Sequence, residues 1–66
     1  MQNVVKVERT RCGLTQAQLA EMVSVSRQTI HSIEKGRYIP STTLALKLAR
    51  ALDRPVEQLF SLEEGD

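Results

Sequence analysis

The sequence predicts an all-α protein, a compact five-helix domain with a possible short β-strand at its C-terminal end. Alternation of apolar and polar residues, which marks a half-buried strand, is nearly absent from the 66 residues. Apolar residues recur instead at helical spacing, and Ser, Thr and Gly stand where helices would begin and end. The length suits one domain, which we expect to span residues 1–66.

A chain this short needs an efficient source of stability, because it buries only about 60% of the surface that its unfolded form exposes. Cys12 has no second cysteine to pair with, and His31 is the only histidine, so we expect neither an internal disulfide nor a metal site. Good helix packing and a homodimer are the remaining sources. The sequence shows no apolar run of membrane-spanning length and no signal-peptide pattern, so we expect a cytoplasmic protein without a membrane partner.

The first two helices are predicted from their end residues. Asn3 can cap a helix over residues 4–12, and Gly13 can end it in the left-handed conformation. Thr15 opens a Thr-x-x-Gln capping box, which predicts a second helix over residues 16–23. The apolar face of this second helix is expected to contain Leu19, Met22 and Val23.

A third helix is predicted over residues 27–35, with Ser26 as its N-cap and Gly36 at its end. Its apolar side consists only of Ile30 and Ile33. With these two isoleucines turned inward, the side chains that point outward are Gln28, Ser32 and Lys35, with His31 beside them and Arg27 at the leading end.

The fourth helix is predicted from Ser41 to about Leu52, after a loop over residues 37–40. Leu46 lies outside its apolar stripe, so a dimer contact and packing within the chain are equally open for it. Pro55 suits the first position of a short fifth helix ending at Phe60. The acidic tail over residues 61–66 is expected to be frayed or to form an edge strand. The apolar stripe of the fourth helix contains Leu44, Ala45, Leu48, Ala49 and Leu52.

Charge is distributed unevenly along the chain, although the net charge is only +1. Residues 1–40 carry six basic and three acidic side chains, whereas residues 41–66 carry three basic and five acidic ones. A basic front and an acidic tail suit a protein that binds phosphates at one end. A solvated surface with randomly scattered charge is the alternative interpretation.

Four segments, in this order and spacing, resemble the Cro/CI-type helix-turn-helix family, also called the XRE family. The resemblance covers residues 3–60 and implies a lambda-repressor-like DNA-binding domain whose motif spans residues 16–35. Ser24 departs from the family pattern, which has glycine at this turn, so we expect strain or a different turn there. The segments are Gly13-Leu14-Thr15-Gln16-Ala17-Gln18-Leu19-Ala20, Val25-Ser26-Arg27-Gln28-Thr29-Ile30, Ile33-Glu34-Lys35-Gly36 and Pro40-Ser41.

The resemblance implies double-stranded DNA as the partner, with the third helix in the major groove. Arg27, Gln28 and Ser32 are then the first candidates for contacts with base edges, and Thr29 and His31 are the second. Further candidate DNA contacts, chiefly to phosphates, are Gln16, Ser26, Lys35, Arg37 and Tyr38. Tyr38 could equally be a partly buried anchor of its loop.

Arg9 and Glu34 lie off the predicted DNA face, and the resemblance implies a structural salt bridge between them. Cys12 is expected to be a small apolar residue at a helix end, with a redox switch as the lesser alternative. The apolar residues near the C-terminus, with Leu46, are the candidate dimer interface: Leu59, Phe60 and Leu62.

The leading functional hypothesis is a sequence-specific transcriptional regulator, a repressor that binds a near-palindromic operator as a homodimer. An antitoxin that uses the same DNA-binding module is the alternative, although the short tail leaves no long segment to wrap a toxin. An enzyme is not expected, because the sequence has no paired catalytic side chains and no phosphate-binding glycine loop. No cofactor, metal or small-molecule ligand is expected either.

Overall fold

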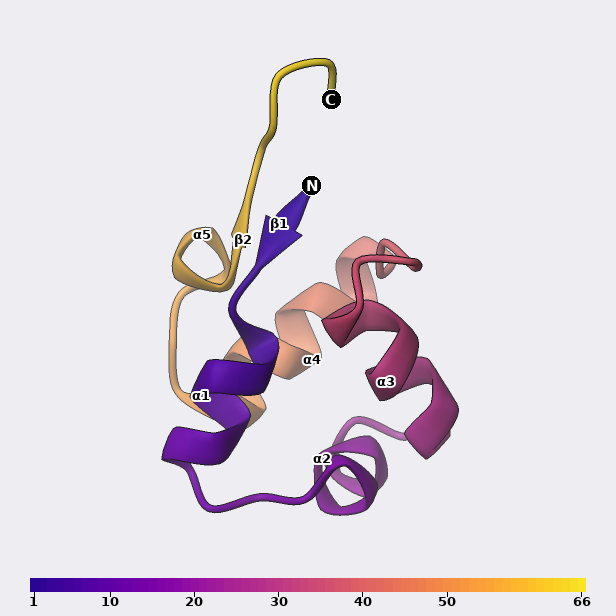
Figure 1. The fold of residues 1–66 in the computed structure, drawn as a ribbon. Coiled ribbons are helices and arrows are strands. Elements are labelled where there is room, and N and C mark those ends of the chain that lie inside the picture. The colour runs from indigo at the N-terminus through magenta and orange to yellow at the C-terminus, as the bar shows by residue number, and fades with distance from the viewer.

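The computed structural model describes residues 1–66. Five helices surround the core, and a two-stranded ribbon joins the two ends of the chain (Figure 1). All five predicted helices are present. Of the tail over residues 61–66, only Ser61 is in a strand, and residues 62–66 lie beyond it. This strand pairs with the N-terminus, with Gln2 opposite Ser61 and Asn3 opposite Phe60 in an antiparallel pair. The elements are β1 (Gln2–Asn3), α1 (Val5–Arg11), α2 (Gln16–Met22), α3 (Arg27–Glu34), α4 (Thr42–Leu52), α5 (Val56–Leu59) and β2 (Phe60–Ser61).

The predicted N-caps of α2, α3 and α4 are confirmed. At α2, the Gln18 N–H donates to Thr15 Oγ1 at 3.0 Å, and the Thr15 N–H donates to Gln18 Oε1 at 2.8 Å. Ser26 and Ser41 each accept a hydrogen bond from the backbone N–H three residues further on, at 3.1 and 3.2 Å. Each of these caps contributes about 1 kcal/mol to stability, which is large for helices this short.

The turn between α2 and α3 has a left-handed residue, although serine and not glycine occupies that position. Ser24 has a φ angle of 61°, in the region where the family pattern has glycine. A side chain in this conformation costs about 1–2 kcal/mol, so the departure at Ser24 appears as backbone strain and not as a different turn. Asp53 ends α4 in the same conformation with φ 54°, and aspartate tolerates it better than most residues do.

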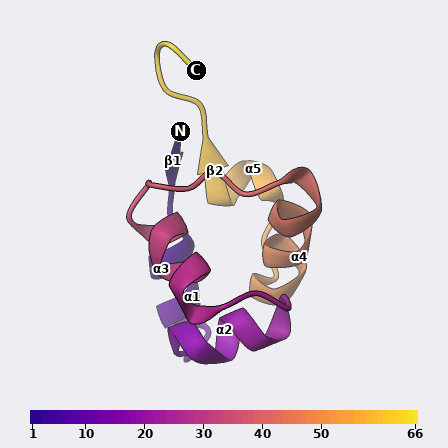
Figure 2. The same ribbon diagram turned by 90° about the vertical axis from the view of Figure 1, so that its right-hand side faces the viewer.

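The core receives at least one residue from every helix, with α3 lying against both α1 and α2 (Figures 1 and 2). Full burial of a valine, leucine or isoleucine side chain is worth about 1.5–3 kcal/mol, so this cluster is the main source of stability. Its members are Val5, Leu19, Ala20, Val23, Ile30, Ile33, Leu44, Leu48, Leu52 and Leu59.

Two apolar residues, Met22 and Leu59, differ from the prediction in whether they are buried or exposed. Met22 is 54% exposed, whereas Leu19 and Ala20 are buried. At about 100° per residue, the buried side of α2 is centred between these two residues, and Met22 points more than a quarter-turn away. Leu59, predicted as a dimer contact, is 1% exposed because α5 folds back against α4 and turns this leucine into the core. Leu59 is therefore a core residue and is removed from the dimer interface.

Several helix ends shift by one residue from their predicted positions. The N-cap of α1 is Val4 and not Asn3 as predicted, so the helix begins at Val5. Asn3 still contacts the start of this helix, since its Oδ1 accepts from the Val5 N–H at 3.1 Å. Pro55 is the N-cap of α5, with ψ 148°, and not its first helical residue. Phe60 leaves the helix for β2 because the tail pairs with β1, so α5 ends at Leu59.

Candidate nucleic-acid interface

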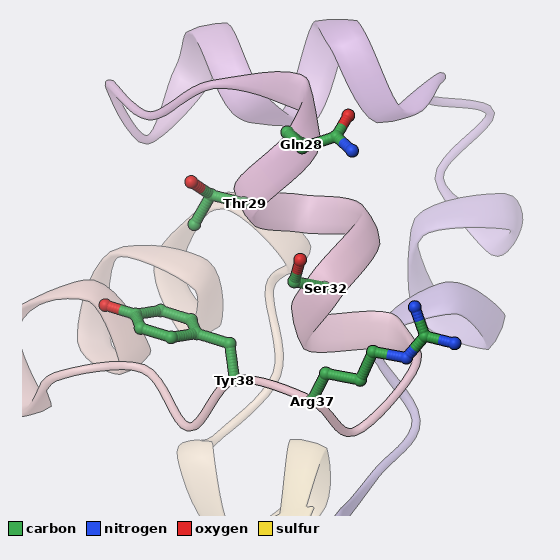
Figure 3. Close-up of a pocket in the computed structure, with 5 residues that line it drawn as sticks. All are labelled: Gln28, Thr29, Ser32, Arg37 and Tyr38. Carbon is green, nitrogen blue, oxygen red and sulfur yellow. The ribbon is translucent and has the colours of Figure 1, made fainter.

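The outward side of α3 and the loop after it form a hollow of about 310 Å³ that is lined mainly by residues with polar side chains. Gln28 and Thr29 line it from the first turn of α3 and Ser32 from the next turn, and Arg37 and Tyr38 border it from the loop (Figure 3). The loop is held near the helix because the Arg37 N–H donates to the Ser32 carbonyl oxygen at 2.9 Å. The hollow therefore combines amide, hydroxyl, guanidinium and phenol groups on one rigid surface.

A second hollow, of about 330 Å³, lies further toward the start of α3 and shares Gln28 with the first. Its other lining residues are Arg27, His31 and Gln16, the last of which comes from α2. The two hollows together make a continuous polar strip, which we call the α3 face. It consists of Gln16, Arg27, Gln28, Thr29, His31, Ser32, Arg37 and Tyr38.

Several side chains of the α3 face have no hydrogen-bond partner within the chain. Arg27, Gln28 and Ser32 make no side-chain hydrogen bond, and the same holds for Arg37 and Tyr38. Exposed donors and acceptors that are free in the isolated protein lose no internal partner when they bind a ligand. These five groups are accordingly available for an external polar partner.

The hydroxyl groups at the start of α3 are used within the chain. Ser26 Oγ accepts from the Thr29 N–H and also lies 3.0 Å from Thr29 Oγ1. Ser26 therefore serves mainly as the N-cap of α3. Its side chain is still exposed, beside Arg27. Thr29 is half-buried and borders the first hollow.

Gln16 connects the start of α2 to the far end of α3. Its Nε2 donates to Glu34 Oε1 at 3.0 Å and lies 3.5 Å from His31 Nδ1. This contact fixes the position of the Gln16 side chain and one edge of the second hollow. It also makes Glu34 an acceptor for two different helices.

Arg9 and Glu34 form the ion pair that the resemblance implied. Arg9 Nε lies 2.7 Å from Glu34 Oε2, and the two side chains are 13% and 3% exposed. A second nitrogen of Arg9 donates to the Leu14 carbonyl oxygen at 2.8 Å, so this guanidinium also fixes the segment before α2. Because the pair is shielded from water, loss of one partner would leave a poorly solvated charge.

Lys35 and Tyr38 differ in their position relative to the α3 face. Lys35 is the C-cap of α3 and is exposed, but it lines neither hollow, so the structure does not group it with Gln28 and Ser32. Tyr38 is 46% exposed, which leaves its ring accessible from the first hollow. Its ring forms one border of this hollow (Figure 3).

The candidate dimer residues that remain after removal of Leu59 lie on two separate parts of the molecule. Leu46 is 56% exposed on α4, and Leu62 is 82% exposed in the tail beyond β2. Phe60 is half-buried and packs against the core. No hollow is lined by Leu46 together with Phe60 or Leu62 within one copy.

One contact near α3 had no signal in the sequence. Asn3 Nδ2 donates to the Ile33 carbonyl oxygen at 2.9 Å, so β1 is attached to the last turn of α3. The residues are 30 positions apart, and only the folded structure brings them together. Asn3 thus holds both the start of α1 and the end of α3.

The structure contains no group of three or more His, Cys, Asp or Glu side chains placed to bind a metal ion. None of its helices is long and apolar enough to cross a membrane. Cys12 is a free, exposed thiol 3.8 Å from the Leu52 carbonyl oxygen.

A family model described as "Helix-turn-helix" matches residues 5–59, which is most of the chain. The chain belongs to the Cro/CI-type helix-turn-helix family. Members of this family are DNA-binding transcriptional regulators and not enzymes. The fold prediction is confirmed as well, since five helices in this arrangement are shared with solved structures of the family.

The comparisons with individual proteins agree with this family. The chain is 50% identical over 64 residues to the HTH-type transcriptional regulator YgzD of Bacillus subtilis, and this match covers 97% of each chain. It is 51% identical over 65 residues to an HTH-type transcriptional regulator of Methanothermobacter thermautotrophicus, covering 97% of this chain and 94% of the relative.

Two solved structures resemble this helix-turn-helix chain closely. The restriction-modification controller protein C.AhdI from Aeromonas hydrophila superposes with a TM-score of 0.79 and 36% identity, over 85% of each chain. The clp gene regulator ClgR from Corynebacterium glutamicum gives a TM-score of 0.75 and 31% identity, over 79% of this chain and 55% of its own.

Proposed function

We propose that this helix-turn-helix regulator recognises a specific DNA sequence by placing the α3 face in the major groove. The observation that carries the proposal is the set of polar side chains on that face that have no partner within the chain. Arg27, Gln28 and Ser32 contact base edges, with Thr29 and His31 beside them. A helix fits the width of the major groove, where each base pair presents a distinct pattern of donors and acceptors.

The chemistry of these side chains matches particular bases. An arginine can donate two hydrogen bonds to the O6 and N7 of guanine, and a glutamine can bond N6 and N7 of adenine. A serine hydroxyl can serve as donor or acceptor for several bases. Arg27 therefore favours a guanine near the start of α3, and Gln28 favours an adenine beside it.

Contacts with the phosphates come from the borders of the α3 face. Ser26 lies at the start of α3, and Gln16 borders the face from α2. Arg37 and Tyr38 lie in the loop after α3, with Lys35 next to them. Such contacts fix the position of a protein on the duplex but do not distinguish sequences. The charge of Arg37 and Lys35 makes this part of the binding dependent on salt.

The regulator acts in the cytoplasm as a homodimeric repressor on a near-palindromic operator. A two-fold dimer presents two α3 faces to half-sites about one helical turn, or 34–36 Å, apart. Leu46, Phe60 and Leu62 supply the dimer contact, of which Leu46 and Leu62 are the most exposed. Residues 1–66 act as one domain, and occupation of a promoter by this small protein is enough to block transcription.

Selection of binding sites from a pool of random DNA tests the proposal. The expected result is a consensus with two-fold symmetry, enriched by the natural chain. A variant with Arg27, Gln28 and Ser32 all changed to Ala should lose the consensus, while Gln58→Ala, at an exposed glutamine of α5, should retain it. Failure of the natural chain to enrich any sequence at low salt would contradict the proposal.

A further inference from the structure

A second surface of the protein lies outside the α3 face, where the end of α2 meets α4. One hollow there, of about 420 Å³, and a neighbouring one of about 210 Å³ share Lys47 and Arg50. Met22 borders the first hollow and Leu46 borders the second. We call this region the α2–α4 surface; its residues are Met22, Ser24, Thr43, Leu46, Lys47, Arg50 and Ala51.

The α2–α4 surface combines exposed apolar side chains with unpaired positive charge. Met22 and Leu46 are 54% and 56% exposed. Lys47 and Arg50 take part in none of the salt bridges of the chain, and no acidic residue lines either hollow. DNA phosphates would neutralise the two cations but would leave the methionine and the leucine exposed. A ligand with an apolar side chain flanked by carboxylates would cover the apolar residues and also neutralise the two cations.

The tail of the chain, residues 61–66, contains an apolar side chain next to carboxylates. Leu62 is 82% exposed and is followed directly by Glu63 and Glu64. Glu63 Oε1 lies 2.9 Å from the N-terminal ammonium of Met1, whereas Glu64 has no ion-pair partner. One tail therefore carries an unburied leucine and at least one free carboxylate.

The tail and the α2–α4 surface cannot meet within one copy. Figures 1 and 2 both place the tail at the end of the molecule opposite α2, pointing away from it. Six residues reach about 20 Å when extended. The two shorter dimensions of the molecule are 21 and 20 Å. In this copy residues 63–66 form a turn whose Asp66 pairs with the Met1 ammonium. Once that turn opens, a tail is long enough to lie across one face of a neighbouring copy.

We propose that the tail of one copy docks on the α2–α4 surface of a second copy. Leu62 lies between Met22 and Leu46, and Glu64 pairs with Lys47 or Arg50. When both copies exchange tails, the contact forms twice and the dimer is two-fold symmetric. This inference rests on the proposed homodimer and explains how Leu46 and Leu62, on separate parts of one copy, belong to one interface.

Cross-linking between single cysteines tests the pairing directly. In a Cys12→Ser background, a Leu46→Cys chain is mixed with a Leu62→Cys chain and oxidised. The expected product is the mixed disulfide, in excess over links between identical chains. Links only between two Leu62→Cys chains, or no links at all, would overturn the proposal. Both positions are exposed, so the substitutions leave the core unchanged.

Charge reversal gives a second test that includes a rescue. The double change Lys47→Glu and Arg50→Glu should raise the dissociation constant of the dimer at least about tenfold, measured by sedimentation. Adding Glu63→Lys and Glu64→Lys to the same chain should restore association, whereas Lys6→Glu, at an exposed lysine of α1, should have little effect. Unchanged association of the Lys47→Glu, Arg50→Glu chain would refute the inference.

A titration of half-site DNA distinguishes the tail from DNA as the occupant. The reversal at Lys47 and Arg50 should leave half-site affinity and its salt slope close to those of the Lys6→Glu control. A fall in both, with association unchanged, would assign the α2–α4 surface to phosphates and overturn the proposal. Failure of the natural chain to select any DNA sequence would instead contradict the proposed function, independently of dimerisation.

Discussion

The helices α2 and α3 begin alike, but their polar side chains have different partners. Each follows a hydroxyl N-cap and has glutamine in its first turn. In α2 the side-chain amide of Gln16 donates to Glu34, and the side-chain oxygen of Gln18 accepts from the Thr15 N–H. In α3 the amide of Gln28 has no partner within the chain. The same residue type thus supports the fold in one helix and is free for a ligand in the other.

Glu34 is the main cause of this difference. It lies at the end of α3, where it receives Arg9 from α1 and Gln16 from α2. The start of α3 has no corresponding carboxylate, so Arg27 and Gln28 stay unpaired. The comparison shows that the position of Glu34 gives Gln16 a structural partner and leaves Gln28 without one.

The largest effect is expected for Glu34→Ala. The change removes the acceptor of two side chains and leaves Arg9, which is 13% exposed, without its partner. We expect a loss of about 3 kcal/mol in the free energy of unfolding. Urea denaturation measures it, with Glu21→Ala, at an exposed acid of α2, as the control. An unchanged melting temperature together with lost DNA binding would show that Glu34 acts in recognition and not in structure.

Gln28→Ala should affect recognition and leave stability unchanged. Loss of a base contact is expected to relax the preference at one base pair by about 1–3 kcal/mol. Binding to the selected operator and to its single-base variants measures the change, with Gln58→Ala as the matched control. A fall in stability without any change in base preference would place Gln28 on the structural side of the comparison, with Gln16.

Ser24→Gly tests the turn that joins the two helices. Glycine adopts a φ of 61° without a steric penalty, so we expect a gain of about 1 kcal/mol in the free energy of unfolding. Ser24→Ala keeps the penalty and should give no gain, which separates the backbone effect from the loss of the hydroxyl. Equal stabilities of the Ala and Gly variants would show that the turn is not strained.

The smallest effect is expected for Arg37→Ala, because its predicted contact is with phosphate. Affinity should fall to a similar extent for all sequences, and the slope of log affinity against log salt should decrease by about 1. Titrations at several salt concentrations, on the operator and on unrelated DNA, measure both quantities. If Arg37→Ala changed base preference while Gln28→Ala changed only the salt slope, the two assigned roles would have to be exchanged.

The sequence predicted best those features that depend on neighbouring residues. The Thr15 capping box, the caps at Ser26 and Ser41 and the inward pair Ile30 and Ile33 follow from spacings of three or four residues, and all are confirmed. The outward residues of α3 follow from the same periodicity. Their contacts with DNA remain predictions.

Features that depend on distant elements were not predicted correctly or at all. Leu59 and Met22 are both apolar and close to a helix end, so the sequence could not show which neighbour would cover them. Leu59 lies in the core because α5 folds back on α4, and Met22 is exposed because α3 covers the adjacent side of α2. The bond from Asn3 to Ile33 depends on where β1 lies, which is set by pairing with the tail.

The pairing of β1 with β2 also has a consequence for the order in which the chain assembles. This ladder joins the two ends of the chain and contains only two residues on each side. Closing so long a loop costs much entropy for few hydrogen bonds, so the ladder should form last and open first. Amide protons of the ladder should therefore exchange with deuterium sooner than those of α3. Opening of the ladder would release Asn3 from the Ile33 carbonyl, so the last step of folding is also the one that completes the support of α3.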